Sequence, residues 1–409
     1  MWVCGLRDIG LEKFLADRVN FMAASEIKEL IKITEGKKVI SLAGGLPDPQ
    51  TFPRNELIGI IGKILSEKGD KVLQYSPTKG ISELRSELFN FLNSREVMAR
   101  NNDDVIVTTG SQQALHIIAL TLINPKDYVV MELPSYLGAI NAFKLSEPNF
   151  VGVPLDDDGM NVDILEARLR RLYSEGKKVK LVYTIPIAHN PAGVTMSLER
   201  RKHLIELADR YDFLIIEDDP YSSFTYEPSD TTSLKSLDKN SRVIYISTLS
   251  KILAPGLRIG WILASKEIVD VFERCKQSLD LHTSTFAQYV SLEAIKSGIV
   301  KSVIERARTI YKRKKDVMLD ALEKYLVPGC WWSKPVGGLF IMLRLPKEEI
   351  DTSKMLFEAI DAGVAYVPGG SFYVDGSGVN TMRLNFSFPK EEEISEGIKI
   401  LSSVVKRHL

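Results

Sequence analysis

The sequence predicts an open, mostly parallel α/β sheet, followed by a smaller α+β unit. Between about residues 56 and 300, apolar runs of strand length alternate with helical patterns. Most of these runs are near-continuous in Val, Ile, Leu or aromatic residues, as expected for strands that are covered on both faces. Such alternation is typical of an open α/β sheet. At 409 residues the chain is also longer than one hydrophobic core usually supports, so we expect two or more compact units.

The expected strands of the sheet lie at residues 104–109, 127–132, 150–154, 180–186, 212–219, 242–248 and 258–264. Helices are expected between them, among others at 111–123 and 197–211. In sheets of this kind, ligands bind beyond the carboxyl ends of the strands. The residues that directly follow each apolar run are therefore where chemistry is expected.

The pattern changes on either side of this region. After about residue 300, a long amphipathic helix (302–326) is followed by the run GGLFIMLRLP, a helix at 352–362, and the runs VAYVPG and TMRLNFSF. This order predicts a small α+β domain. The N-terminal residues contain one expected helix (26–34) and the Gly- and Pro-rich stretch SLAGGLPDPQTFP, a pattern typical of an arm. We therefore expect an arm at 1–55, a large domain at 56–300 and a small domain at 301–409.

The composition excludes several classes of protein. Lys+Arg and Asp+Glu are both 53, so the net charge is zero and there is no basic footprint for nucleic acid. The three cysteines (Cys4, Cys275 and Cys330) have neither the number nor the spacing of a disulfide framework or a zinc site. No apolar run reaches transmembrane length, and the first residues do not follow the plan of a signal peptide. We expect a cytoplasmic protein without a metal and without a nucleic-acid or membrane partner.

Two strand ends carry polar groups that could serve a cofactor. The first strand ends in TTGSQQ and leads into a helix, so that Gly110, Ser111 and Gln112 form an anion site at the positive end of the helix dipole. An ordinary capped turn is the alternative. The run DFLIIEDDPY ends in two acids, which could be metal ligands, acid or base groups, the partner of a protonated ring nitrogen, or a cap of the next turn. No GxGxxG follows a strand and no GxxxxGK[ST] is present, so the usual nucleotide fingerprints are missing.

A lysine follows another apolar run, in the stretch STLSKILAPGLR (247–258). Keeping a lysine charged at the buried end of a strand is costly, so Lys251 needs a chemical reason. A Schiff base to a phosphorylated aldehyde supplies one. Thr248, Ser250 and Arg258 would then hold the phosphate together with the helix start at Gly110.

These motifs resemble, in order and along nearly the whole chain, the fold-type I pyridoxal-phosphate aminotransferases of class I/II. The similarity is greatest to the branch of the 2-aminoadipate and kynurenine aminotransferases. The matching stretches are SLAGGLPDPQTFP, LQYSPTKGISELR, TTGSQQAL, ELPSYLGA, HNPAG, DFLIIEDDPY, STLSKILAPGLRIGW, DLHTS, VPGGSFY and MRLNFS. The resemblance implies a large domain with a mostly parallel seven-stranded sheet, a small α+β domain, and pyridoxal 5'-phosphate as cofactor.

The resemblance also implies roles for individual residues around the cofactor. Lys251 would form the Schiff base and shuttle the Cα proton, and Asp218 would pair with the pyridine nitrogen. Asn190 and Tyr221 would hydrogen-bond the ring oxygen, while Tyr136 would stack on the ring. The phosphate would be held by Gly110, Ser111, Gln112, Thr248, Ser250 and Arg258.

Further implied residues serve the substrate and the partner subunit. Tyr75 would reach the phosphate of a second subunit, which makes the expected enzyme a homodimer. Arg383 would hold the substrate α-carboxylate, next to Asn190. The alternation in TMRLNFSF supports it, because Arg383 lies on the opposite strand face from the neighbouring apolar residues. Gly45 and Leu46 would let the arm pass close to the substrate.

Some positions depart from the family pattern. Thr248 stands where serine is usual, which preserves the hydroxyl. The usual Gln-Asn-Pro-Thr-Gly reads His-Asn-Pro-Ala-Gly from His189, and Asn190 is kept. Lys28 stands where relatives that prefer aminoadipate tend to carry arginine; it either binds a distal substrate carboxylate without a bidentate fork or is a solvated helix lysine. His282 in DLHTS is expected near the site, as either a structural or a catalytic histidine.

The function implied is a transaminase that takes an amino group from 2-aminoadipate, an aromatic amino acid or another donor and passes it to 2-oxoglutarate. The reaction would follow a ping-pong cycle of aldimine and ketimine states. A β-lyase acting on carbon–sulfur bonds shares the same cofactor grip and stays open. A fragment of a pyridoxal-phosphate-responsive transcription regulator also stays open, although no basic recognition helix precedes the large domain.

Overall fold

The expected sheet is present, with one additional edge strand. The computed structural model describes residues 10–22 and 39–409. The seven expected strands are β2 (Asp103–Thr108), β3 (Tyr128–Leu133), β4 (Asn149–Asp156), β6 (Val179–Thr184), β7 (Leu214–Asp218), β8 (Val243–Thr248) and β9 (Gly260–Ser265). Their spatial order is β2-β9-β8-β7-β6-β3-β4, and β5 (Gly159–Met160) pairs with β4 at the edge. β5 escaped sequence prediction because two residues are too few to show a periodicity.

The strand directions place the carboxyl ends of the central strands together. β8, β7, β6, β3 and β4 form parallel pairs, whereas β9 runs antiparallel to both β2 and β8. The loops that follow β3, β6, β7 and β8 therefore leave from one edge of the sheet. In an open α/β sheet this edge is where ligands bind.

Successive side chains of the central strands enter two different hydrophobic cores. On β3, Val129 and Met131 belong to one buried cluster, and Val130 between them belongs to the other. On β6, Leu181 and Val182 separate in the same way. Both faces are covered, which explains why these strands read as continuous apolar runs. The covering helices are α4 (Ser111–Leu122) and α9 (Lys266–Leu279) on one face and α6 (Val162–Ser174) and α7 (Leu198–Tyr211) on the other.

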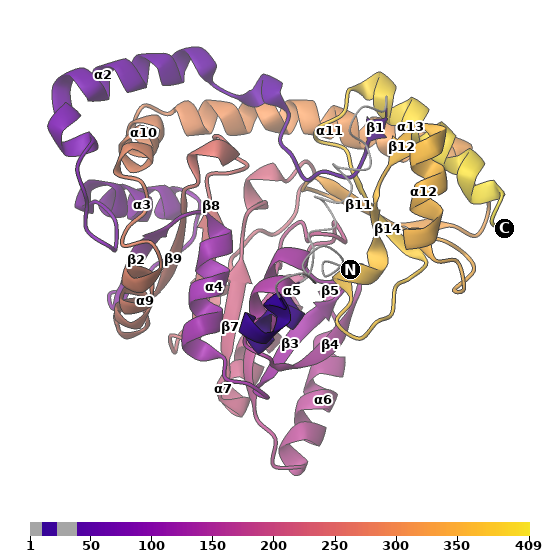
Figure 1. Cartoon of the computed structure of the whole chain (residues 1–409), viewed down its shortest axis with the longest axis horizontal. Coiled ribbons are helices and arrows are strands. Elements are labelled where there is room, and N and C mark those ends of the chain that lie inside the picture. Colours follow the sequence, from indigo (N-terminus) through magenta and orange to yellow (C-terminus); the bar gives the residue numbers. More distant parts are fainter. Residues whose placement is uncertain (1–9, 23–38) are drawn as a thin grey trace.

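The C-terminal part forms a second layered unit. The expected long helix is α11 (Ile299–Tyr325), and it leads to a four-stranded antiparallel sheet in the order β10-β11-β14-β13. Figure 1 shows this sheet beside α12 and α13, away from the larger sheet. The elements are β10 (Trp331–Trp332), β11 (Phe340–Arg344), α12 (Thr352–Ala362), β13 (Val367–Pro368), β14 (Thr381–Asn385) and α13 (Glu391–Lys406).

The arm joins the C-terminal unit through a short parallel pair. β1 (Ile40–Ser41) pairs with β12 (Val364–Ala365), and the backbone N–H of Leu42 donates to the carbonyl of Ala365 at 2.8 Å. In Figure 1 the chain then runs from β1 to α2, so it bridges the two units. The expected helix at 26–34, with Lys28, lies outside the described residues. The domain limits at 55 and 300 stay predictions.

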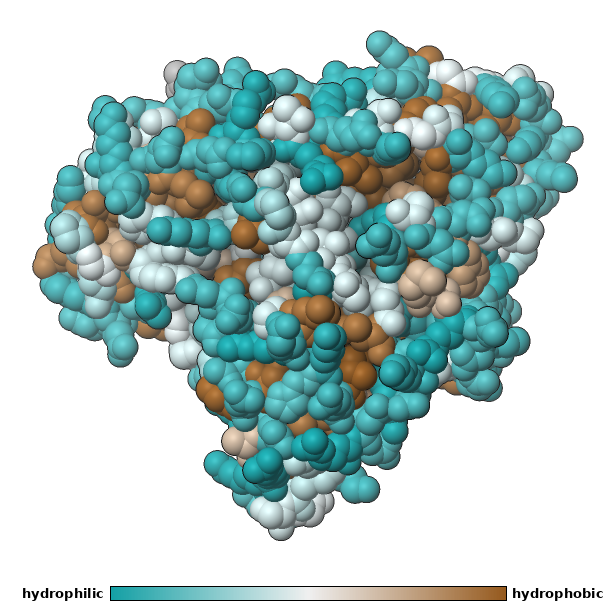
Figure 2. Space-filling model, turned by 180° about the vertical axis from the view of Figure 1, so that it is seen from behind, coloured by the Kyte–Doolittle hydropathy of each residue, from teal (hydrophilic) through white to brown (hydrophobic). Residues whose placement is uncertain are grey.

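The remaining α-helices of the described residues complete the large unit. They are α2 (Arg54–Val72), α3 (Ser82–Ser94), α5 (Leu137–Lys144), α8 (Leu234–Leu237) and α10 (Thr285–Lys296). Seen from behind, the surface is mainly hydrophilic, with several separate apolar patches (Figure 2). Within residues 10–22 and 39–409, no helix is long and apolar enough to cross a membrane.

Candidate active site

A cavity of about 370 Å³ lies where the central strands end and the arm passes. It draws residues from the ends of β6, β7 and β8, from the start of α4, from the arm and from β14. Most of the predicted site residues line it: Gly45, Leu46, Ser111, Gln112, Tyr136, Asn190, Asp218, Tyr221, Thr248, Ser250, Lys251, Arg258 and Arg383. Groups far apart in the sequence are thus brought to one place.

The surroundings of Lys251 favour its neutral amine form. It follows β8 by three residues, and its Nζ donates to the carbonyl oxygen of Gly45 at 2.6 Å. Burial, followed by the positive charges of Arg383 and Arg258, lowers the pKa of Lys251 from 10.5 to about 8. An amine with this pKa is partly neutral near pH 7, and the neutral form attacks carbonyl groups.

Asp218 offers an unmatched acceptor in the same cavity. It is the last residue of β7, and its Oδ2 accepts a hydrogen bond from the Tyr183 hydroxyl at 2.7 Å. Its Oδ1 is buried and has no hydrogen-bond partner among the described residues. Burial, and then the nearby charge of Asp219, raises the pKa of Asp218 to about 7. A buried carboxylate oxygen without a donor fits a protonated ring nitrogen of a ligand.

Arg258 lies against the start of α4, where the sequence predicts an anion site. Gly110 caps α4 with a φ of +75°, and a Cβ at this position would collide with the Arg258 guanidinium. Arg258 Nη2 donates to the carbonyl of Thr109 at 3.5 Å. The hydroxyls of Thr248 and Ser250 lie 2.9 Å apart. Helix N–H groups, two hydroxyls and a guanidinium are donors suited to a phosphate.

Asn190 connects Tyr221 to Arg383. Its Nδ2 donates to the Tyr221 hydroxyl at 3.3 Å, and its Oδ1 accepts from Arg383 Nη1 at 3.0 Å. Burial raises the pKa of Tyr221, so the phenol stays protonated and can donate. Tyr136 stands at the start of α5 and lines the same cavity.

Arg383 occupies the middle of β14 and is buried. Its Nη2 donates to the carbonyl of Ala43, and its guanidinium carbon lies 4.3 Å from the centre of the Phe340 ring. Residues on the same strand face hold the arm: Asn385 N–H donates to the Leu42 carbonyl, and the Ser387 hydroxyl donates to the Leu46 carbonyl. The sequence predicted the role of Arg383 but not the contacts of Asn385 and Ser387 with the arm. The only signal for these contacts was that the three residues share one strand face.

Three residues that were expected at or near the site lie elsewhere or outside the described residues. Tyr75 is 78 % exposed and lines a separate cavity of about 340 Å³. Its ring meets His282 edge-on at 5.6 Å between centroids, and His282 does not line the cavity that contains Lys251. Lys28 lies outside the described residues.

The sequence did not predict the buried pair of Glu132 and His189, the residue before Asn190. His189 Nε2 lies 2.9 Å from Glu132 Oε2, and both side chains are 1 % exposed. Because His189 Nδ1 accepts from the N–H of Ala192, Nε2 carries the hydrogen and donates it to Glu132. Glu132 also accepts from the Thr184 hydroxyl. The pair fixes the turn from which Asn190 reaches the cavity.

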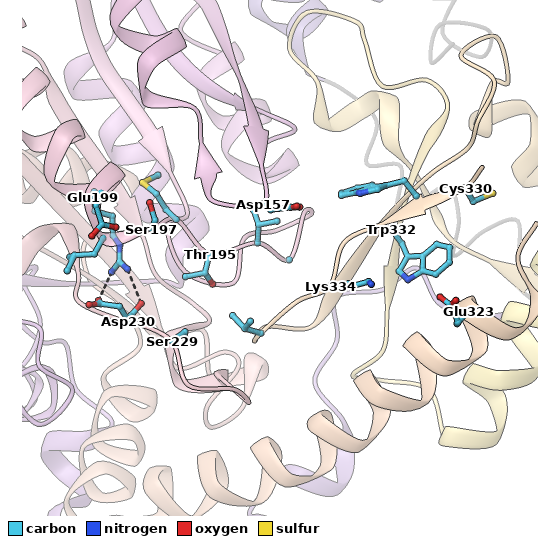
Figure 3. A pocket seen from close by; sticks show the side chains of 17 residues that line it. Asp157, Thr195, Ser197, Glu199, Ser229, Asp230, Glu323, Cys330, Trp332 and Lys334 are labelled. Atoms are coloured by element: carbon cyan, nitrogen blue, oxygen red, sulfur yellow. Dashed lines mark hydrogen bonds and ion pairs between the residues drawn. The ribbon is translucent and has the colours of Figure 1, made fainter. Parts of the chain in front are cut away.

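A larger cavity lies away from this site. A groove of about 990 Å³ opens between the segment before α7 and the β10 region. Figure 3 shows Ser197, Glu199 and Asp230 on one wall and Trp332 and Lys334 on the other, without convergence on a common point. Its dashed lines mark the contacts between Asp230 and the buried Arg201, which is a structural ion pair. The volume of a cavity therefore does not by itself identify the candidate active site.

Comparison with known proteins agrees with the site. The family model for aminotransferases of class I and II matches residues 37–401. The chain is 48 % identical to aromatic-amino-acid aminotransferase 1 of Thermococcus litoralis, over 97 % of this chain and 95 % of the relative. It is 36 % identical to the 2-aminoadipate transaminase of Thermus thermophilus, over 94 % of each chain.

A solved structure extends the agreement to the fold and the cofactor. The kynurenine aminotransferase of Pyrococcus horikoshii, solved in complex with PMP, is 47 % identical and superposes with a TM-score of 0.95 over 98 % of each chain. The fold-type I resemblance is confirmed, and the cofactor is pyridoxal phosphate, whose ring nitrogen and phosphate suit the groups described above. The chain belongs to the class I and II aminotransferases and is a transaminase.

Proposed function

We propose that the enzyme moves the amino group of an aromatic, kynurenine-type or 2-aminoadipate-type amino acid to 2-oxoglutarate by a ping-pong cycle. The observation that carries this proposal is the convergence of Lys251, Asp218 and Arg383 on one cavity of about 370 Å³. The donor classes are taken from the named activities of the relatives. Leu46, Tyr136 and Phe340 give the cavity an apolar surface that accepts an aromatic side chain.

The proposed roles follow from the contacts of each residue. Pyridoxal phosphate, when bound, supplies an electron sink conjugated to the substrate nitrogen. Lys251 first holds the cofactor and then, once displaced by the substrate, carries the Cα proton as general base and acid; its lowered pKa suits both directions of transfer. Asp218 keeps the ring nitrogen protonated through its unmatched Oδ1. Tyr221 and Asn190 orient the ring oxygen.

The cofactor phosphate and the substrate carboxylate are assigned to different residues of the cavity. We assign the phosphate to Gly110, Ser111, Gln112, Thr248, Ser250 and Arg258. Arg383 binds the α-carboxylate, a group that amino donors and 2-oxo acid acceptors share. The same arginine therefore serves both half-reactions. Whether Lys28 binds a distal carboxylate or is solvated stays open.

The enzyme is proposed to act as a cytoplasmic homodimer in which Tyr75 reaches the phosphate of the partner subunit. Tyr75 is exposed and does not line the cavity of its own chain. Ile58, near the start of α2, is 69 % exposed, and Leu73, just after α2, is 75 % exposed. Large exposed apolar side chains on one segment favour a protein interface. The free thiols of Cys275 and Cys330 fit a reducing compartment.

A spectroscopic screen of donors and acceptors tests the proposal. The purified holoenzyme is mixed with single amino acids, and the conversion of its absorption band is followed; 2-oxo acids are then added to the converted enzyme. Conversion by aromatic or 2-aminoadipate donors and reversal by 2-oxoglutarate is the expected result. Release of pyruvate and ammonia without any need for an oxo acid would instead identify a β-lyase. No conversion with any donor would refute the proposal.

A further inference from the structure

A fully buried lysine stands behind the phosphate-binding turn and does not line the catalytic cavity. Lys276 lies near the end of α9 with an exposure of 0 %. A buried ammonium is costly unless its donors are all matched. Here Nζ donates to Gln113 Oε1 at 2.8 Å, to Asp280 Oδ1 at 2.8 Å and to Thr283 Oγ1 at 3.0 Å. Lys276 is thus the centre of a complete polar cluster.

On one side this cluster fixes the turn that precedes α4. Asp280 Oδ2 accepts from the Thr109 hydroxyl at 2.8 Å and from Gln113 Nε2 at 2.7 Å. Gln113 Oε1 also accepts from the backbone N–H of Thr109 at 2.8 Å. Thr109 directly precedes Gly110, and its carbonyl accepts from Arg258. Any displacement of the cluster therefore moves the backbone on which the phosphate site is built.

On the other side the cluster fixes the loop that carries His282. The Thr283 carbonyl accepts from His282 Nδ1 at 2.9 Å, and because a carbonyl only accepts, Nδ1 carries the hydrogen. The same nitrogen lies 3.2 Å from the Ser76 hydroxyl, and the imidazole and Tyr75 rings meet in a T-shaped contact. Leu281 has a φ of +65°, which a leucine adopts only where its surroundings impose it.

The contacts thus form one path from the phosphate turn to an exposed tyrosine. We propose that Lys276 and Asp280 are positioning residues that couple the phosphate site of one subunit to the Tyr75 that this subunit lends to its partner. The inference rests on the proposed homodimer, since Tyr75 serves a second site only there. Loosening the cluster in one subunit then weakens cofactor binding in both. Such coupling between sites is typically about 5- to 150-fold in affinity.

Two variants disrupt the contacts between the phosphate turn and Tyr75 at different residues, and a third variant on the same helix is the control. Lys276→Met removes the central charge, and Thr109→Val removes a single hydroxyl while keeping the side-chain shape, in case Lys276→Met does not fold. Lys266→Met is the control, because Lys266 pairs with Asp270 at 2.8 Å on the same helix with the same i,i+4 spacing but is exposed. The cofactor dissociation constant of each protein is measured by titrating the cofactor-free dimer with pyridoxal phosphate, with thermal melting as a check of folding.

Mixed dimers separate coupling from a local role. One subunit is wild type, and the other combines Lys251→Ala with Thr109→Val, Lys276→Met or the control Lys266→Met. We expect the dissociation constant at the wild-type site to rise about 5-fold or more with Thr109→Val or Lys276→Met, and to stay unchanged with the control. Equal affinities at the wild-type site in all mixed dimers would overturn the coupling.

Failure of the proposed function gives a different result. A mixed dimer with Lys251→Ala alone in one subunit should retain about half of the transamination of the wild type. If neither this dimer nor the wild type transfers an amino group, the function is wrong, whereas normal transfer with equal affinities refutes only the coupling.

Discussion

Replacing Arg383 by methionine should raise the pKa of Lys251 in the cofactor-free enzyme. Burial lowers this pKa to about 8, with Arg383 as the larger and Arg258 as the smaller of two charge contributions. With a pKa of about 8, about one tenth of the lysines are neutral at pH 7, against about one in 3,000 at the ordinary value. Each unit by which the pKa rises lowers the neutral fraction about tenfold.

The assay is the pH dependence of labelling by a small aldehyde reagent. Labelling at Lys251 is quantified in peptides by mass spectrometry, and the exposed Lys266 in the same digest is the internal reference. The wild-type midpoint should lie near pH 8, with a higher midpoint in Arg383→Met and a smaller rise in Arg258→Met. A wild-type midpoint above pH 10, or no movement in either variant, would refute the argument from burial and charge.

Three further changes test other parts of the site. Asp218→Asn removes the charge that faces the ring nitrogen and should lower kcat about 10²- to 10³-fold with little change in cofactor content, as measured by steady-state kinetics and absorbance. Gly110→Ala introduces a Cβ at a φ of +75° against Arg258; strain of about 1–3 kcal/mol should weaken cofactor binding about 5- to 150-fold in a titration of the cofactor-free enzyme. Arg383→Lys keeps the charge but loses the fork, and the loss of about 1.5–3 kcal/mol should raise the KM for donor and acceptor alike by about 10- to 150-fold; a rise for only one of them would contradict a shared carboxylate site.

The sheet could be predicted because the burial of each central strand is recorded in that strand's own residues. The central strands, such as β6, are covered on both faces, and a strand buried in this way must be apolar along its length, as Leu181 and Val182 illustrate. Lys251 and Asp218 could be predicted as site residues because each is a charged residue at or just after the end of such an apolar run. β5 left no signal because it is two residues long.

The supporting networks could not be predicted, since they depend on which distant segments meet. Lys276 occurs in an amphipathic helix whose other charged residues are exposed or half-buried, and it is buried where this helix meets Gln113 and the 280–283 loop. Glu132 ends an apolar run just as Asp218 does, but its side chain meets His189 instead of the cavity. The contact of Tyr75 with His282 could not be predicted either, because it depends on the tertiary structure. The proposed role of Tyr75 depends on a second subunit.

Transfer of a labelled amino group tests the central claim most directly. The holoenzyme is incubated with ¹⁵N-labelled phenylalanine or 2-aminoadipate and with 2-oxoglutarate, and the products are analysed by mass spectrometry, with Lys251→Ala beside the wild type. The proposed mechanism predicts label in glutamate from the wild type and none from Lys251→Ala. Labelled ammonia without labelled glutamate, or undiminished transfer by Lys251→Ala, would contradict it.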